Sequence, residues 1–150
     1  MAKIHSTSYA SDYSNMRAQS CAMNENNDCA VVALAIVCNV SYAVAHAELK
    51  KLGRKDRKGT FFHHTAQAVK NLGKSLQYVS ARSFIDTYPG VHKNLKHVTT
   101  HHPRRFNKCF DPSKTYLFQT RRHILAVKNG ETKDWTVNKA KQVVAIHEVF

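Results

Sequence analysis

Cys29 is the residue whose surroundings most favour chemistry. It follows the polar stretch Asn26–Asp28 and precedes Ala30–Val37, an apolar run without charge or helix breaker. This pattern predicts a buried helix that begins at or next to Cys29, with Asn27 and Asp28 able to cap its free amides. The positive end of a helix favours thiolate over thiol, and its unpaired amides can stabilise an oxyanion. Cys29 is therefore a candidate nucleophile, although a small buried core residue is the alternative.

A histidine and an aspartate that could serve Cys29 are predicted on one face of a C-terminal hairpin. Asn129-Gly130 is a strong two-residue turn signal, and such a turn pairs position 128 with 131 and position 125 with 134. Because side chains alternate along strands, His123 and Asp134 become diagonal neighbours. Asp134 could orient the imidazole, which leaves the other ring nitrogen to take the thiol proton. Each residue alone could instead be an ordinary solvated side chain.

The elements that would hold these residues predict an α+β chain, with helices first and a sheet last. Helical spacing predicts a second helix from Tyr42 to Leu52, capped by Ser41 and ended by Gly53. A third helix is expected from a cap at about Thr60 to Gly73. Its expected buried residues are Phe61, Ala68, Val69 and Leu72. Alternating patterns predict strands over 75–81, 114–120, 122–128, 131–137 and 141–150.

Length and composition indicate one domain over residues 1–150, with an arm over about 1–20. No run approaches the roughly 18 apolar residues of a membrane span, and the N-terminus lacks the apolar region of a secretory signal, so we expect a cytoplasmic protein. The four cysteines show no paired spacing, which argues against a disulfide framework. His101, His102 and Cys109 lack further ligands at zinc spacing, so no metal or cofactor is expected.

Charge is the strongest compositional feature, with 23 Lys and Arg against 10 Asp and Glu and a formal net charge of +13. Such a chain attracts polyanions. The stretch 54–60 is expected to be an exposed basic loop. The candidate polyanion contacts are Arg54, Lys55, Arg57, Lys58, Arg104, Arg105 and Lys108. A basic protein that binds nucleic acid or an acidic protein partner, without using Cys29, is therefore the alternative to an enzyme.

The chain also carries motifs in a recognisable order. NDCAVVAL is followed by SYAVAHAELKKLGRKDRKGT and, near the end, by RRHILAVKNGETKDW. A cysteine on the first core helix, followed by histidine and aspartate on later strands, resembles the papain-like cysteine peptidases. The start is similar to that of bacteriocin-leader-processing peptidases, and the whole set is closer to small phage and prophage proteins with NDC, GR, GT, RxHxxAV and DW motifs. The resemblance covers roughly 26–80 and 115–150, with about 89–112 as an inserted basic loop region.

This resemblance implies a papain-like α+β fold and a phage-encoded hydrolase that cleaves a peptide, isopeptide or related amide bond. It assigns the nucleophile to Cys29, the base to His123 and the orienting acid to Asp134. Acyl transfer to an amine or thiol acceptor would use the same residues. Papain-like enzymes usually carry an oxyanion-hole glutamine six residues before the nucleophile, where this chain has Met23. Asn24 is the first side-chain candidate for that role.

Overall fold

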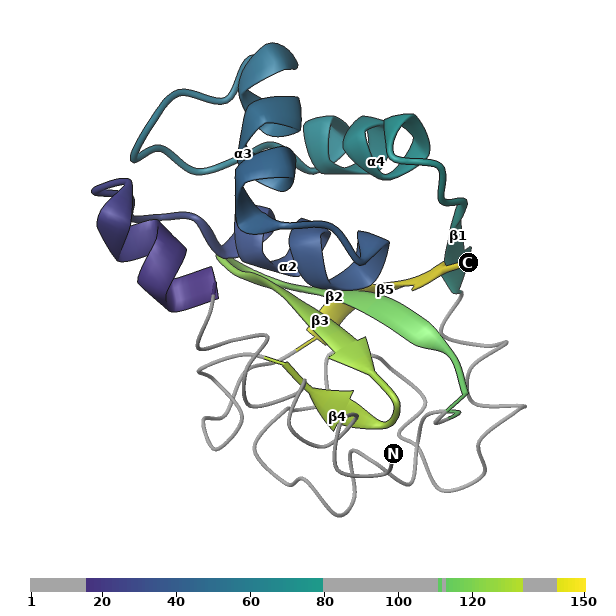
Figure 1. The fold of residues 1–150 in the computed structure, drawn as a ribbon. Helices are drawn as coiled ribbons and strands as arrows, with labels where there is room; N and C mark the ends of the chain where they lie inside the picture. The colour runs from purple at the N-terminus through teal and green to yellow at the C-terminus, as the bar shows by residue number, and fades with distance from the viewer. Residues whose placement is uncertain (1–15, 80–110, 112, 134–142) are drawn as a thin grey trace.

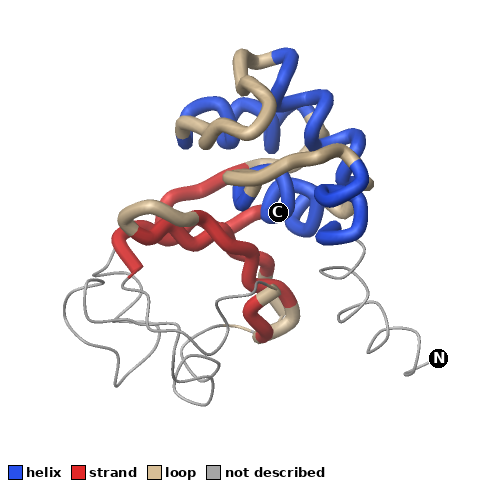
Figure 2. The backbone as a smooth tube through the Cα atoms, turned by 90° about the vertical axis from the view of Figure 1, so that its left-hand side faces the viewer, coloured by secondary structure: helices blue, strands red, loops and turns tan. Residues whose placement is uncertain are grey.

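Helices pack on one face of an antiparallel sheet (Figure 1). In this computed structural model the residues described are 16–79, 111, 113–133 and 143–150. Helices lie in one layer and strands in another (Figure 2). The predicted α+β class is thereby confirmed, with the helices preceding the strands in the chain.

Helix α2 (Cys29–Cys38) is the helix on which the other elements pack, because its residues are apolar on every side. Every residue from Ala30 to Cys38 is buried. A helix that is apolar all round must be enclosed, and α2 contacts α3, α4, β2 and β3. It ends at Asn39, whose left-handed φ of 55° lets its amide close the last turn. At its other end, the helix begins at Cys29, as the sequence pattern predicts.

Helix α3 (Tyr42–Lys51) forms as predicted. The Ser41 hydroxyl accepts a hydrogen bond from the Val44 amide at 3.2 Å, which caps the first turn. Tyr42, the first residue of α3, is fully buried. Gly53 follows the helix with a φ of +119°, a conformation that side chains rarely adopt.

Helix α4 (Phe62–Asn71) differs from the prediction at its start. Phe61, not Thr60, is the residue before the helix, and no side chain caps it. Ala68 and Val69 are buried as predicted, whereas Phe61 is 71% exposed. Because Phe61 precedes the first helical residue, the helical spacing does not describe where its side chain points.

The sheet pairs the C-terminal strand with a strand from the middle of the chain. Its strand order is β1-β5-β2-β3-β4, and every described pairing is antiparallel. The strands are β1 (Leu76–Val79), β2 (Thr115–Thr120), β3 (Ile124–Lys128), β4 (Glu131–Thr132) and β5 (Val143–Val149). β5 lies between β1 and β2, so the C-terminal strand joins the strand that follows α4 to the rest of the sheet.

The β3–β4 hairpin has the predicted turn. Asn129 and Gly130 have φ values of 54° and 74°, and positive φ at both positions is what a type I′ turn requires. Positions 128 and 131 face each other, as do positions 127 and 132. The Lys133 amide donates to the Ala126 carbonyl at 2.9 Å, so the predicted pairing continues to the residue before Asp134. Asp134 itself lies outside the described residues.

Strand β3 is buried on both faces, which anchors the hairpin beneath α2. Ile124 and Ala126 belong to the core cluster that contains α2. Leu125 and Val127, on the opposite face by alternation, are buried as well. The end of β3 is therefore held in a fixed relation to the helix.

Several sequence predictions fall on residues that the structure does not describe. They concern the candidate contacts Arg104, Arg105 and Lys108, the side chains His101, His102 and Cys109, and most of the arm and of the 89–112 region. Within the arm, residues 16–20 belong to a helix that runs over 16–22, with Met16 and Ser20 buried. Among the described residues no single helix is long and apolar enough to cross a membrane, and α2 and α3 meet that test only as a pair bent by 116°.

Candidate active site

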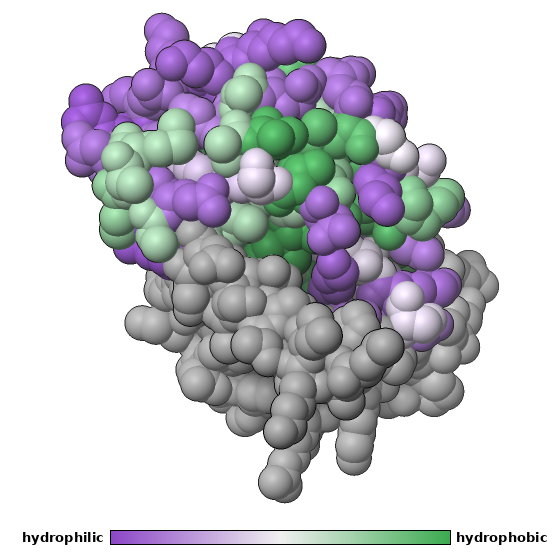
Figure 3. Space-filling model, viewed as in Figure 1, coloured by the Kyte–Doolittle hydropathy of each residue, from purple (hydrophilic) through white to green (hydrophobic). Residues whose placement is uncertain are grey.

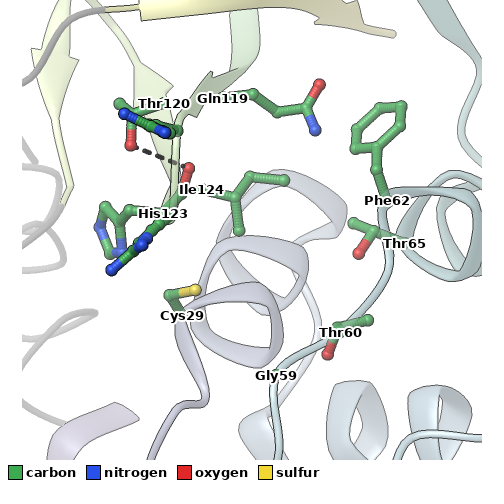
Figure 4. Close-up of a pocket in the computed structure, with 11 residues that line it drawn as sticks. Cys29, Gly59, Thr60, Phe62, Thr65, Gln119, Thr120, His123 and Ile124 are labelled. Atoms are coloured by element: carbon green, nitrogen blue, oxygen red, sulfur yellow. Dashed lines mark hydrogen bonds between the residues drawn. The ribbon is translucent and has the colours of Figure 1, made fainter.

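A pocket of about 230 Å³ lies between the start of α2, the connection from α3 to α4 and the turn from β2 to β3 (Figure 4). Cys29 and His123 both line this pocket, and Figure 4 shows them at one end, across from Phe62 and Thr65. The remaining lining residues are Gly59, Thr60, Gln119, Thr120, Arg121, Arg122 and Ile124. Three segments that are distant in the sequence therefore meet around the thiol.

Cys29 is the first residue of α2, and the amides of that first turn are not used by a capping side chain. Asp28 occupies the cap position but makes no capping hydrogen bond, so the predicted role of Asp28 as a cap is wrong. Its carboxylate instead accepts a hydrogen bond from the Tyr42 hydroxyl at 2.8 Å. The first amides of a helix have no partner within the helix. Because no side chain among the described residues caps them, these amides can stabilise negative charge beside the sulfur.

The Tyr42–Asp28 hydrogen bond is buried and ties α3 to the start of α2. Tyr42 is fully buried, and the Asp28 residue is 7% exposed. Burial, together with donation to Asp28, raises the pKa of the Tyr42 phenol. Tyr42 therefore stays a hydrogen-bond donor. The Asp28 carboxylate accepts this hydrogen bond instead of one from the amides of its own helix.

His123 reaches the pocket from the tight turn between β2 and β3. Gln119 pairs with Ile124 across the two strands. The Thr120 amide and hydroxyl both donate to the His123 carbonyl, at 2.8 and 3.2 Å. These bonds fix the backbone of His123 next to the buried strand end. The structure thus brings two of the three predicted catalytic residues, Cys29 and His123, into one pocket.

Glu25 organises the turn that leads into Cys29. Its carboxylate accepts hydrogen bonds from the Arg54 guanidinium at 2.6 Å and from the Arg57 amide at 2.5 Å, and lies 2.6 Å from His46 Nε2. Burial alone would raise the pKa of Glu25, but the hydrogen bonds from Arg54, Arg57 and His46 outweigh it and lower this pKa to about 2. Glu25 is therefore a carboxylate at neutral pH.

The same cluster has the spacing of a metal site. Ligand atoms of Glu25, His46 and Asp56 lie within 4.8 Å of one another. The Arg54 guanidinium already supplies a cation to Glu25 at 2.6 Å. A metal ion would have to displace that buried side chain, so the cluster is a structural ion-pair network around Glu25.

Two sequence predictions need correction here. Arg54 is buried and paired with Glu25, so it does not belong to an exposed basic loop. Lys55, Arg57 and Lys58 are exposed as predicted. Asn24, the predicted oxyanion donor, is exposed in a left-handed turn with φ of 54° and does not line the pocket. The chain turns at Asn24 so that Glu25, one residue later, points inward.

Sequence reasoning did not single out Gln119, Arg121, Arg122, Phe62 and Thr65 as site residues. Figure 4 shows the Gln119 side chain extending over the pocket toward Phe62. The sequence could have indicated that Arg121 and Arg122 lie at the site, because they directly precede the candidate base His123. Nothing local marks Phe62 or Thr65, which enter the site through the packing of α4.

No protein-family model, curated protein or solved structure matches this chain. The geometry of the pocket and the chemistry of its residues therefore carry the functional argument.

Proposed function

We propose that the protein is a cysteine hydrolase that cleaves a peptide, isopeptide or related amide bond through an acyl-enzyme. The observation that carries this proposal is the pocket shared by Cys29, at the start of α2, and His123, in the closed turn just before β3. A thiol at a helix N-terminus beside an imidazole is the arrangement that activates a cysteine nucleophile. The papain-like fold and a phage origin are part of the proposal.

In the proposed reaction the Cys29 thiolate attacks the amide carbonyl, so that a C–S bond forms and an electron pair moves onto oxygen. Backbone amides at the start of α2 stabilise this oxyanion. The C–N bond then breaks, and the His123 imidazolium gives its proton to the leaving amine. Water attacks the thioester while His123 accepts a proton, which releases the acid and restores the thiolate. Asp134 is proposed to orient the imidazole.

Water is not the only acceptor that this chemistry allows. An amine or thiol that attacks the same thioester would give acyl transfer instead of hydrolysis. Both reactions need Cys29 and His123 in the same roles. Product analysis in the presence of an added amine separates the two outcomes.

Thiol labelling tests the proposal directly. We would incubate the protein with iodoacetamide or a peptide aldehyde at neutral pH and locate the adduct by intact mass and peptide mapping. Cys21 is exposed and serves as an internal control. Cys38 is buried, and burial raises its pKa to about 11. We expect iodoacetamide to label Cys29 faster than Cys21, although Cys29 is the less exposed thiol.

The His123→Ala variant completes this test. If His123 assists the thiol, labelling of Cys29 slows in the variant while labelling of Cys21 keeps its rate. Equal rates for Cys29 and Cys21 in the wild type, with no effect of the substitution, would contradict the hydrolase proposal. Circular dichroism establishes that the variant is folded.

A second candidate function rests on the exposed basic side chains. Lys55, Arg57 and Lys58 are exposed on the loop between α3 and α4. Figure 3 shows hydrophilic residues along the upper edge of the molecule, where α3 and its loop lie in the view of Figure 1. We propose as the alternative that this surface binds nucleic acid or an acidic protein. Phosphate contacts would make such binding fall steeply with salt, and it would not need Cys29.

A further inference from the structure

We propose that the substrate of this pocket is an acidic peptide, whose carboxylate binds Arg121 and Arg122 next to the bond that Cys29 attacks. This inference rests on the proposed cysteine hydrolase and adds the class of substrate. Four steps support it: the fixed backbone of the two arginines, the absence of acids from the described part of the pocket lining, the second basic segment, and the size of the pocket.

Arg121 and Arg122 occupy a fixed position beside the candidate base. They form the two-residue turn between Thr120 and His123, which the two hydrogen bonds from Thr120 to the His123 carbonyl close. Both arginines line the pocket and both are exposed. A short closed turn fixes the backbone from which both side chains extend, so no backbone freedom of a loop has to be lost when they bind a ligand.

No described residue of the pocket lining balances the charge of the two guanidinium groups. Among the residues that the structure describes, none that lines the pocket is an aspartate or glutamate. Among the described residues, neither Arg121 nor Arg122 takes part in an ion pair. Two adjacent guanidinium groups, always protonated, repel each other unless an anion lies between or beside them. A bound carboxylate would supply that anion.

A second basic segment flanks the thiol from the opposite side. The Asn27 side-chain amide donates to the Arg57 carbonyl at 3.3 Å, two residues before the nucleophile. Lys58 lies between Arg57, whose carbonyl contacts Asn27, and Gly59, which lines the pocket. Lys58 and the side chain of Arg57 are exposed. Positive charge on both sides of the pocket attracts an anionic ligand toward Cys29.

The size of the pocket favours a peptide over a nucleic acid. Its volume of about 230 Å³ lies below the ~300–1,000 Å³ that is typical of pockets for drug-sized ligands. One or two amino-acid side chains fill such a space. The guanidinium fork matches a carboxylate or a phosphate, so the small volume is what favours a peptide. Tight nucleic-acid binding would depend on many phosphate contacts along an extended track.

Peptide aldehydes that differ only in charge test this inference. We would prepare short peptide aldehydes of identical length in two sets. One set varies the residue that carries the aldehyde, and the other varies the residue before it, with Glu, Gln or Lys at the varied position. Inhibition of iodoacetamide labelling at Cys29 reports their affinity. We expect Glu to bind about fivefold more tightly than Gln in one of the sets, and Lys to bind most weakly. High salt should reduce this difference.

Matched variants separate the arginines from the general charge of the protein. Arg121→Gln/Arg122→Gln should abolish the preference for Glu, and Arg121→Glu/Arg122→Glu should reverse it in favour of Lys. Lys70→Gln/Lys74→Gln removes the same charge from exposed positions that do not line the pocket, and should keep the preference. Labelling of Cys29 by neutral iodoacetamide should keep its rate in the lysine variant. For each arginine variant, inhibition is expressed relative to its own labelling rate without aldehyde.

The outcomes distinguish this inference from the function on which it rests. If Cys29 reacts rapidly but the aldehydes show no preference for Glu, or if the lysine variant loses the preference equally, the acidic-peptide inference is wrong and the hydrolase proposal stands. If Cys29 reacts no faster than Cys21 and no aldehyde protects it, both proposals fail. Tight binding of single-stranded nucleic acid that blocks labelling would replace the peptide with a nucleic acid.

Discussion

The Arg54 guanidinium lies 2.6 Å from the Glu25 carboxylate, and both side chains are buried, at 0% and 1% exposure. This ion pair joins the turn before Cys29 to the loop that follows α3. Arg54 also donates to the Asn26 carbonyl at 3.4 Å. The two segments that border the thiol are therefore held together by charges that water does not reach.

Removing Glu25 should destabilise the fold strongly. The Glu25→Ala variant leaves the Arg54 charge buried without its carboxylate, and breaking a buried pair in this way costs about 3–5 kcal/mol. Urea unfolding followed by circular dichroism measures the change. Asp56→Asn is the control, because Asp56 is exposed and lies 3.5 Å from His46; it should change stability by less than about 1 kcal/mol.

The same carboxylate should make stability depend on acidic pH. The folded pKa of Glu25 is about 2, below its ordinary value of 4.5. Its contribution is therefore complete above about pH 4.5 and is lost as pH falls toward 2. Thermal unfolding at a series of pH values should show this loss in the wild type. A Glu25→Gln variant that keeps the full acid sensitivity would show that other groups cause it.

The Tyr42 hydroxyl should stabilise the start of α2. Tyr42→Phe removes the donor and leaves the buried Asp28 carboxylate without this hydrogen bond, which should cost about 1–3 kcal/mol. Val44→Ala, at an exposed position of the same helix, is the control. We also expect slower alkylation of Cys29 in Tyr42→Phe, because Asp28 becomes free to take the amides of the first turn. An unchanged alkylation rate would show that Asp28 does not compete for them.

Cys29→Ala and His123→Ala should each abolish amide hydrolysis without unfolding the protein. Because the two residues act as a unit, the double variant should be no worse than either single one. Asp134→Ala should have a milder effect, since its predicted role is orientation. Turnover of a chromogenic peptide amide measures all four variants. Additive losses in the double variant would contradict a shared catalytic role.

Polyanion binding should depend on the exposed lysines and arginines and not on Arg54. Replacing Lys55, Arg57 and Lys58 with Gln should lower the slope of log K against log salt by about one unit for each lost phosphate contact. Fluorescence anisotropy with a labelled single strand measures this slope. Cys29→Ala should leave the slope unchanged. A slope that is equal in the wild type and the triple variant would remove this loop from the interface.

Local patterns in the sequence determined the helix that begins at Cys29, the Ser41 cap and the Asn129-Gly130 turn. Each of these features depends on residues within a few positions, so their backbone preferences and spacing can be read directly. The pairing register followed from the turn. The predicted strand 122–128 included His123, whereas β3 begins at Ile124 and His123 lies in the turn before it. The α+β class followed from the order of the patterns, because helical spacing comes first along the chain and strand alternation comes last.

Only the tertiary structure decided which polar groups lie inside. Asp28 bonds Tyr42, which is 14 residues away, instead of capping its own helix. Arg54 is buried because Glu25, 29 residues earlier, supplies its partner, although its neighbours in sequence are charged and exposed. Arg121 and Arg122 face the pocket because strand pairing carries their turn to α2. Such contacts depend on how separate segments pack, which no local pattern contains.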